Sequence, residues 1–292
     1  MSVPRLSVVI VNFEAGQHLA ECVRAALQSP AAEVLVVDNA SSDDSLGAVR
    51  ALAERDPRLR VLQNPENRGF ARASNQGLAA TGGEYVLFLN PDCTVPPATL
   101  PRMLAVMEAH PEAAMAGCLV MNPDGSEQPG CRRETPTPAK ALVRAFRLPQ
   151  RFGARGYLLA GRPLPSAPTD VEAISGAFML VRRSAINEVG PLDEGYFLHC
   201  EDLDWCLRFR QSGWHILFVP DVTAVHAKGV SSRRRPLRVL WHMHRGMIRY
   251  YRKFFRKEYP APLFWLVVAA VAARFVGLSA LTMIRLPRGA GR

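Results

Sequence analysis

A run of apolar residues, Tyr85-Val86-Leu87-Phe88-Leu89, ends directly in Asn90-Pro91-Asp92. Consecutive apolar residues bounded by glycines and a proline are typical of a buried strand in a parallel sheet. Open α/β sheets bind their ligands at the carboxyl ends of such strands, so Asp92 is a candidate ligand for a divalent cation, which prefers oxygen partners. Asn-Pro-Asp also favours an ordinary turn, and this stretch alone therefore supports both interpretations.

The chain before this stretch predicts a parallel sheet covered by helices. Segments with strand-like and helix-like apolar spacing alternate in the order Leu6–Val11, Leu19–Leu27, Val34–Val37, Leu46–Ala53, Arg60–Leu62 and Arg72–Ala80. This order indicates parallel strands with helices on both faces. We therefore expect the α/β class, and 292 residues suffice for one large domain of this kind or two small ones.

The pattern becomes less regular in the second half of the chain. Residues 100–109 predict a helix and residues 114–121 an extended segment. Residues 122–169 are rich in proline and basic side chains, with only a short helical stretch near 139–146, and regular structure returns at Ile174–Val181. A long irregular segment is typical of a lid or binding loop, or of partial disorder.

Asn12 and Asp38 each stand at the carboxyl end of a predicted strand. Neighbouring parallel strands end at the same edge of a sheet, so we expect these side chains to converge on one crevice, where a nucleotide base could pair with them. Taken singly, each is better explained as the polar end of a strand. Residues 14–17 do not form a G-x-G-x-x-G motif, which disfavours a dinucleotide-binding dehydrogenase.

A second acidic cluster, Glu201-Asp202-Leu203-Asp204-Trp205, opens a predicted helix that ends near Gly213. One or two oxygen acceptors are enough to cap a helix, so a third carboxylate in the first turn suggests a further role. The helix dipole favours ionised carboxylates there, and a positioned carboxylate can take a proton from a hydroxyl. The alternative is a solvated acidic turn, but the flanking His199 and Trp205 better suit a sugar-binding wall.

His226 follows a short apolar run after the strand-like segment Trp214–Pro220. A lone histidine in this position is usually structural. Imidazole is nevertheless an acceptable ligand for a manganese-type ion, and Asp, His and two phosphate oxygens would nearly fill such a coordination shell.

In their order along the chain these motifs resemble glycosyltransferase family 2, the inverting enzymes of the GT-A fold. The likeness is greatest to bacterial rhamnosyltransferase-like members, which build cell-surface polysaccharide. The stretches that carry it are Ser7–Phe13, Val37–Asp43, Asn67–Ala71, Leu89–Asp92, Gly176–Met179, Glu201–Trp205 and His226. Each motif is weak by itself, whereas their joint occurrence in this order over roughly residues 5–232 is specific.

The resemblance implies a Rossmann-like, mostly parallel sheet with helices on both faces, in a GT-A domain at residues 1–232. Its nucleotide-sugar-binding half would be residues 1–121, and its acceptor and catalytic-base half residues 122–232. A membrane-associated helical tail would occupy residues 233–292.

The resemblance also implies roles for single residues. The donor nucleotide would be held by Asn12, Asp38, Gly69 and Asn90, the metal by Asp92 and His226, and the acceptor by Gly176, Asp204 and Trp205. Asp202 would be the general base, with Glu201 beside it in the catalytic pair. Gly69 would let the backbone approach the nucleotide, and the cofactor would be Mg²⁺ or Mn²⁺ on the donor diphosphate.

Asn90 departs from the family's Asp-x-Asp motif, of which Asp92 is the last position. An amide oxygen can ligate a hard cation but adds no charge, so Asn90 would contact either a more weakly held metal or the sugar. This departure motivates an alternative function, a membrane-tethered nucleotide-sugar-binding protein with impaired catalysis.

The function implied by the resemblance is inverting transfer of a sugar from a dTDP- or UDP-linked donor, and the sugar that we expect is L-rhamnose from dTDP-rhamnose. The acceptor would be a lipid-linked or cell-surface glycan, for example one carried on a polyprenyl diphosphate. Two separated acidic sites agree with this chemistry, because one activates the acceptor and the other serves the departing diphosphate. A retaining hydrolase would instead place two carboxylates about 5 Å apart around one bond.

The basic residues are concentrated in the tail. Residues 228–292 contain 15 of the 36 Lys and Arg residues but only one of the 26 Asp and Glu residues, interleaved with aromatic side chains. This pattern suits an anionic membrane surface, whereas a nucleic-acid partner is disfavoured because no recognition fold accompanies the charge. The six cysteines form no C-x-x-C pair and no signal peptide is recognisable before Ser7, so we expect reduced thiols in a cytoplasmic protein.

Residues Leu263–Ile284 are apolar except for Arg274 and would span roughly 33 Å as a helix, which is long enough for a bilayer core. Arg274 near the middle would cost about 2.5–3.5 kcal/mol on insertion. Both flanks are basic, so the charges do not define an orientation. We expect a helix, or a re-entrant pair, in the interface at the cytoplasmic face of the bacterial plasma membrane, rather than a single span.

Overall fold

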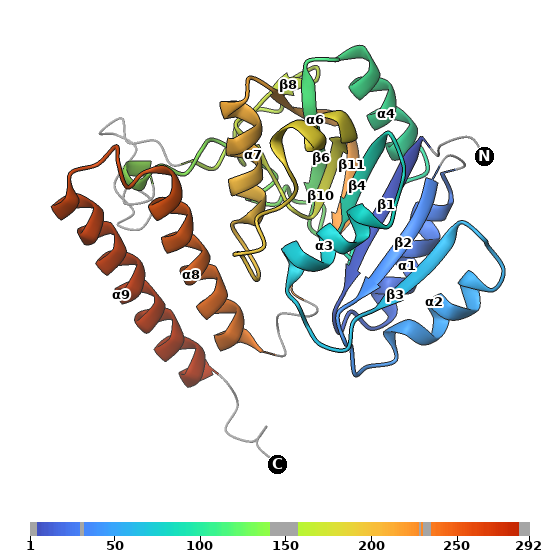
Figure 1. Cartoon of the computed structure of the whole chain (residues 1–292), viewed down its shortest axis with the longest axis horizontal. Helices are drawn as coiled ribbons and strands as arrows, with labels where there is room; N and C mark the ends of the chain where they lie inside the picture. The colour runs from blue at the N-terminus through green and yellow to red at the C-terminus, as the bar shows by residue number, and fades with distance from the viewer. Residues whose placement is uncertain (1–4, 30–31, 141–156, 228, 230–234, 286–292) are drawn as a thin grey trace.

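The computed structural model describes residues 5–29, 32–140, 157–227, 229 and 235–285. They form an α/β body and a pair of long C-terminal helices beside it (Figure 1). The elements of the body are β1 (Leu6–Asn12), α1 (Gln17–Leu27), β2 (Ala32–Asp38), α2 (Ser45–Ala53), β3 (Leu59–Gln63), α3 (Phe70–Ala79), β4 (Tyr85–Leu89), β5 (Cys93–Thr94), α4 (Thr99–Ala109), β6 (Ala113–Met121), β7 (Arg132–Arg133), β8 (Thr169–Asp170), β9 (Ala173–Ile174), β10 (Phe178–Arg182), α6 (Arg183–Val189), α7 (Glu201–Gln211) and β11 (His215–His226). The α/β class predicted from the sequence is confirmed.

The body is built on a nine-stranded sheet with the order β3-β2-β1-β4-β10-β6-β11-β5, and β8 pairs with β11. The strands of the first half, β3, β2, β1 and β4, are parallel, as the sequence pattern predicts. Strand β10 runs antiparallel to both β4 and β6, so the sheet as a whole is mixed. Strand β4 therefore lies in the interior of the sheet, and all five of its side chains are buried.

Helices cover both faces of the parallel half because the strands present apolar side chains on both sides. Val34 and Val36 of β2 belong to the main core cluster, together with Leu19 of α1. The alternate residues of β2, Leu35 and Val37, cluster instead with side chains of α3. Successive side chains of a strand point to opposite faces, so α1 and α3 pack on opposite sides of the sheet.

The predicted strand at 174–181 is divided in two, with β9 before residues 175–177 and β10 after them. Strand β9 pairs with β7 in a small second sheet, which gives part of the irregular stretch 122–169 a fixed place. The short helix predicted near 139–146 falls largely outside the described residues. All six cysteines are free and buried.

The C-terminal helices, α8 (Pro236–Phe254) and α9 (Ala261–Arg285), lie side by side (Figure 1). Among the described residues, α9 is the one helix long and apolar enough to cross a membrane, with a mean hydropathy of 2.0 and only 17% of its apolar window buried. Nδ1 of His244 in α8 donates to the Leu240 carbonyl, so Nε2 of the same ring can accept a hydrogen bond. Arg274 of α9 donates to this Nε2, with 2.9 Å between the two nitrogens. The charge inside the apolar helix therefore has a partner on the neighbouring helix.

Helix α8 is joined to the α/β body by an apolar cluster and by ion pairs. Tyr250 and Tyr251 of α8 share a buried cluster with Tyr196 and Cys200, which precede α7. Asp193 accepts hydrogen bonds from Arg249 at 2.8 Å and from Lys253 at 2.8 Å. Burial opposes ionisation of Asp193, but its hydrogen bonds from Lys253, Gly195 and Arg249 outweigh burial and lower its pKa to about 2.

We predict that Asp193→Asn lowers the free energy of unfolding at pH 7 by about 1 kcal/mol, since the pair is partly exposed and screened. An aspartate with a depressed folded-state pKa contributes stability above its unfolded pKa of about 3.9, and that contribution is lost as the pH falls toward about 2. The difference between the two proteins, measured by urea unfolding, should therefore shrink below about pH 4.

Asp221→Asn is the control, because Asp221 pairs with Arg102 at 2.8 Å with both side chains nearly half exposed. We expect this change to cost less than about 0.5 kcal/mol. Equal losses in the two variants at pH 7 would contradict the attachment of α8 through Asp193.

Candidate active site

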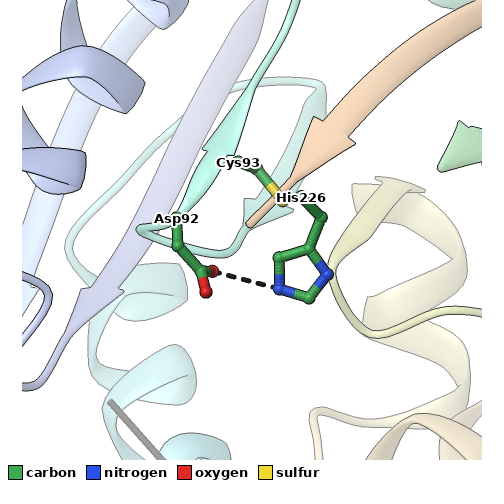
Figure 2. Close-up of side chains that lie close together, drawn as sticks. All are labelled: Asp92, Cys93 and His226. Atoms are coloured by element: carbon green, nitrogen blue, oxygen red, sulfur yellow. Dashed lines mark ion pairs between the residues drawn. The ribbon is translucent and has the colours of Figure 1, made fainter. Parts of the chain in front are cut away.

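Asp92 and His226 meet at the carboxyl edge of the sheet. Asp92 follows β4, and the pairing of β11 with β5 places His226 opposite Cys93. His226 Nε2 lies 3.1 Å from Asp92 Oδ1, and each side chain is only 9% exposed. Figure 2 shows the carboxylate and the imidazole ring pointing toward each other. Strand pairing thus unites two residues that are far apart in the sequence.

Gln128 fixes the orientation and tautomer of the His226 ring. Its Nε2 donates to the His226 carbonyl at 2.9 Å, which requires its Oε1 to face His226 Nδ1 at 3.0 Å. Because Oε1 can only accept, Nδ1 carries a proton, and Nε2 is the ring nitrogen that faces Asp92. Imidazole and carboxylate are both ligands for a cation, and a second hydrogen bond at Nδ1 is usual for a metal-binding histidine.

Cys93 and Asn90 border this pair. Cys93 belongs to the same group of possible metal ligands, whose ligand atoms lie within 4.8 Å of one another. Burial and then the charge of Asp92 raise the pKa of the Cys93 thiol well above its usual value, and the thiol donates to the Ala177 carbonyl at 3.5 Å. Asn90 Nδ2 lies 3.3 Å from His226 Nε2. The donor set of Asp92 and His226, with the Asn90 amide beside it, therefore suits Mg²⁺ or Mn²⁺ better than a thiolate-preferring metal.

Asp202, in the first turn of α7, is held by three hydrogen bonds. Its Oδ2 accepts from Arg133 at 2.5 Å and from the Gly176 amide at 3.2 Å, and its Oδ1 accepts from the Leu203 amide at 2.9 Å. The helix begins after His199 and Cys200, both of which have left-handed backbone conformations, with φ of 70° and 71°. Such conformations are uncommon for residues other than glycine and indicate a turn fixed by its surroundings.

The two adjacent carboxylates of α7 titrate in opposite directions. Burial opposes ionisation of Asp202, but the charge and hydrogen bond of Arg133 outweigh burial, so its pKa lies below the usual range. Burial and the charge of Asp202 raise the pKa of Glu201. Its Oε2 has no hydrogen-bond partner among the described residues. Environments that separate the pKa values of two neighbouring acids favour Asp202, the ionised one, as the base.

Gly176 and Ala177 lie between the Asp92–His226 pair and Asp202. The backbone amide of Asn90 donates to the Ala177 carbonyl at 3.0 Å, and the backbone amide of Gly176 donates to the Asp202 carboxylate. A Cβ at Gly176 would lie 3.3 Å from Asp202 Cβ, so the absence of a side chain there permits the close approach. The Asp92–His226 pair and Asp202 are thereby held on either side of two consecutive residues.

Asn12 and Asp38 converge as predicted. They are paired in register on β1 and β2, and Asn12 Nδ2 donates to Asp38 Oδ1 at 2.7 Å. Asn12 also donates to Ser45 at 2.8 Å, and Asp38 accepts from the Ser41 hydroxyl at 2.6 Å. Asn12 Oδ1 is buried without a partner among the described residues. The pair organises the turn at residues 41–45, and its contact with a nucleotide stays a prediction.

In the structure, the need for glycine at position 69 comes from a backbone contact rather than from room for a nucleotide. Its φ is +83°, and a Cβ there would lie 2.6 Å from the carbonyl oxygen of Phe197. The Phe70 amide donates to the same carbonyl at 2.8 Å. Gly69 is therefore required where the start of α3 meets the loop that leads to α7.

The expectation that Trp205 and Asp204 face an acceptor is corrected by their burial. Trp205 is fully buried, contacts Phe88 edge-on with ring centroids 5.4 Å apart, and donates to the Gly190 carbonyl at 3.0 Å. Asp204 is also fully buried and accepts from Arg208 at 2.8 Å and from Lys253 at 2.7 Å. Both residues hold α7 in place, because the face of the helix that they occupy turns toward the protein interior.

Sequence reasoning did not find Gln128 or Arg133. Both lie in the irregular stretch 122–169, where no periodicity or motif distinguishes one polar residue from another. Their roles follow from contacts with His226 and Asp202, which the fold brings near them.

The sequence profile described as "Glycosyl transferase family 2" matches residues 7–190, more than half of the chain. A curated relative, the N-acetylglucosaminyl-diphospho-decaprenol L-rhamnosyltransferase of Mycobacterium tuberculosis, is 30% identical over 286 residues, which cover 92% of this chain and 91% of the relative. The rhamnosyltransferase WbbL of Escherichia coli is 32% identical over 145 residues, which cover 49% of this chain and 52% of the relative.

Two solved structures are similar in fold. The mannosyltransferase PcManGT of Pyrobaculum calidifontis, solved with GDP-Man and Mn²⁺, superposes with a TM-score of 0.61 at 19% identity, covering 96% of this chain and 76% of that one. GalNAc-T7, solved with UDP, GalNAc and Mn²⁺, superposes with a TM-score of 0.60 at 19% identity, covering 77% of this chain and 44% of that one. The GT-A fold implied by the motifs is thus confirmed.

We predict that Gln128→Leu weakens Mn²⁺ binding about tenfold, because loss of a partner that orients a metal-binding histidine typically lowers affinity by this order. The measurement is a calorimetric titration with Mn²⁺. Gln63→Leu is the matched control, since Gln63 is the exposed last residue of the edge strand β3 and its side chain accepts a hydrogen bond from Arg50 at 2.8 Å. Equal Mn²⁺ affinity in wild type and Gln128→Leu would refute the orienting role.

Proposed function

Because the chain belongs to glycosyltransferase family 2, we propose that it is an inverting, metal-dependent transferase that moves L-rhamnose from dTDP-rhamnose to a sugar linked to a prenyl diphosphate. The rhamnosyltransferase name of a relative that matches 92% of the chain supports both the sugar and the acceptor class.

The observation that carries the proposal is the arrangement around Gly176 and Ala177. Next to the Asp92–His226 pair, the backbone amide of Asn90 donates to the Ala177 carbonyl. The proposed base, Asp202, accepts a hydrogen bond from the Gly176 amide. Transfer with inversion needs a group that receives the acceptor proton on one side of the anomeric carbon and stabilisation of the departing diphosphate on the other. The two sites supply these roles at neighbouring positions.

In the proposed reaction Asp202 takes the proton of the acceptor hydroxyl as its oxygen bonds to the anomeric carbon. The bond from that carbon to the diphosphate oxygen breaks, and its electron pair leaves with the nucleoside diphosphate. Arg133 keeps Asp202 ionised beforehand, and the Gly176 amide fixes the carboxylate. Asp92 and His226 would hold Mg²⁺ or Mn²⁺, which when bound neutralises charge on the leaving diphosphate.

A location at the cytoplasmic face of the bacterial plasma membrane fits the C-terminal helices. Helix α9 carries large exposed apolar side chains along its length, including Trp265, Leu266, Val276 and Ile284. Arg252, Arg256 and Lys257, near the turn between α8 and α9, are exposed and would face anionic lipid head groups. An enzyme held there would meet a lipid-linked acceptor directly.

The rival proposal, a nucleotide-sugar-binding protein with impaired catalysis, is motivated by Asn90 alone. Asp202, His226 and the contacts that orient them are intact in the structure. Measurement of sugar transfer with a lipid-linked acceptor separates the two proposals.

We predict that Asp202→Asn lowers kcat for sugar transfer about 10²- to 10⁴-fold, as expected for loss of a general base, with donor affinity largely retained. Thermal unfolding measured in parallel checks that Arg133 without its carboxylate partner leaves the fold intact. Asp221→Asn, at a half-exposed residue that pairs with Arg102, serves as the control with unchanged kcat. An unaltered kcat in a folded Asp202→Asn protein would exclude Asp202 as the base.

A second prediction concerns the donor and the metal. In the presence of Mn²⁺, dTDP-rhamnose should raise Tm more than UDP-linked sugars do, because the best ligand stabilises the fold by mass action. EDTA should abolish both the shift and the transfer, and added Mn²⁺ should restore them. A larger shift with a UDP-sugar would replace the proposed donor without affecting the proposed reaction type.

A further inference from the structure

A cavity of about 190 Å³ lies between the catalytic helix α7 and the C-terminal helix α8. Asp202 and Arg133 line it on the side of the sheet, while Met243, Met247 and Tyr251 line it on the side of α8. One end of the cavity is therefore charged and contains the proposed base, and the opposite wall is apolar and comes from the tail. Neither Asp92 nor His226 belongs to its lining.

The cavity also contains polar atoms that lack partners. Arg133 Nε and Tyr250 Oη, whose residues both line it, are buried without a hydrogen-bond partner among the described residues. Tyr250 is only 2% exposed. Buried donors of this kind are normally satisfied, so their presence here indicates a ligand that brings oxygen acceptors to the cavity.

The apolar wall leads toward the surface that we assign to the membrane. Helix α8 lies between the α/β body and α9 (Figure 1), and Met247 and Tyr251 of α8 belong to an apolar cluster that also contains Phe264 and Val267 of α9. Trp265, next to Phe264, is 53% exposed. Methionine side chains are flexible and adapt to irregular apolar partners, which suits Met243 and Met247 to an alkenyl chain. A ligand with a polar head and an apolar tail could therefore extend from Asp202 along α8 to the bilayer.

We infer that this cavity binds the prenyl-linked acceptor, with the sugar hydroxyl at Asp202, the phosphate oxygens at Arg133 and Tyr250, and the first prenyl unit against Met243 and Met247. This inference rests on the proposed function for the identity of the ligand. Arg133 then has two partners. It pairs with Asp202 in the free protein, and part of its guanidinium turns toward a phosphate oxygen when the acceptor is bound. The rest of the prenyl chain lies outside the cavity, in the membrane.

The test compares two synthetic acceptors, N-acetylglucosaminyl diphosphate esterified to farnesol and the same compound esterified to methanol. Their binding to the full chain is measured by calorimetry without donor. Met247→Trp fills the apolar wall and should weaken binding of the farnesyl ester at least about tenfold, with little change for the methyl ester. Leu164→Trp, at a side chain 47% exposed, is the control and should change neither affinity.

Tyr250→Phe provides a second variant that alters one oxygen only. It should weaken both esters at least about tenfold, which corresponds to the loss of one hydrogen bond to a charged group. Wild-type affinity of the farnesyl ester in folded Met247→Trp or in Tyr250→Phe would overturn the assignment of the cavity. Sugar transfer is assayed separately, so acceptor binding with the expected variant effects but without rhamnose transfer would count against the proposed function and leave the cavity as the acceptor site.

Discussion

The ion pair between Arg133 and Asp202 organises the site, since it connects three parts of the chain that the sequence keeps apart. Arg133 belongs to β7, which pairs with β9 directly before Gly176, and Asp202 belongs to α7. Both side chains are only 12% exposed. Removal of one member of a buried pair typically costs about 3–5 kcal/mol because the other charge is left uncompensated. The position of β7, the turn at Gly176 and the start of α7 are thus coupled through one contact.

Much of the site could be predicted because strand ends are local features. Asn12, Asp38 and Asp92 each follow an apolar strand, and parallel pairing brings such positions to one edge. His226 required a topological step, the pairing of β11 with β5, which no local pattern contains. Gln128 and Arg133 could not be found because their segment has no periodicity. Trp205 was assigned to the wrong environment, since its residue type suits a sugar site and only tertiary packing shows that its face of α7 is turned inward.

The contacts of the C-terminal helices differ from those expected of a basic tail that faces only the membrane. Its composition predicts cations that face lipid, yet Arg249 and Lys253 pair with Asp193, and Lys253 also reaches Asp204. Arg274, which would be costly in a lone membrane helix, contacts His244. Net charge describes a segment as a whole, whereas the partner of each cation depends on how the helices pack. Helix α8 is therefore packed against the α/β body, and α9 presents the apolar surface.

The bond between Lys253 and the fully buried Asp204 has a practical consequence for anyone who prepares this enzyme. Removal of the hydrophobic C-terminus is a common way to make a membrane-associated protein soluble. A chain shortened before Pro236 would lose a cation that neutralises Asp204, two residues from the proposed base Asp202, and would expose Tyr196 and Cys200, which α8 covers. Solubilisation in detergent with the whole chain intact preserves the helix that carries Asp202, whereas truncation would damage it.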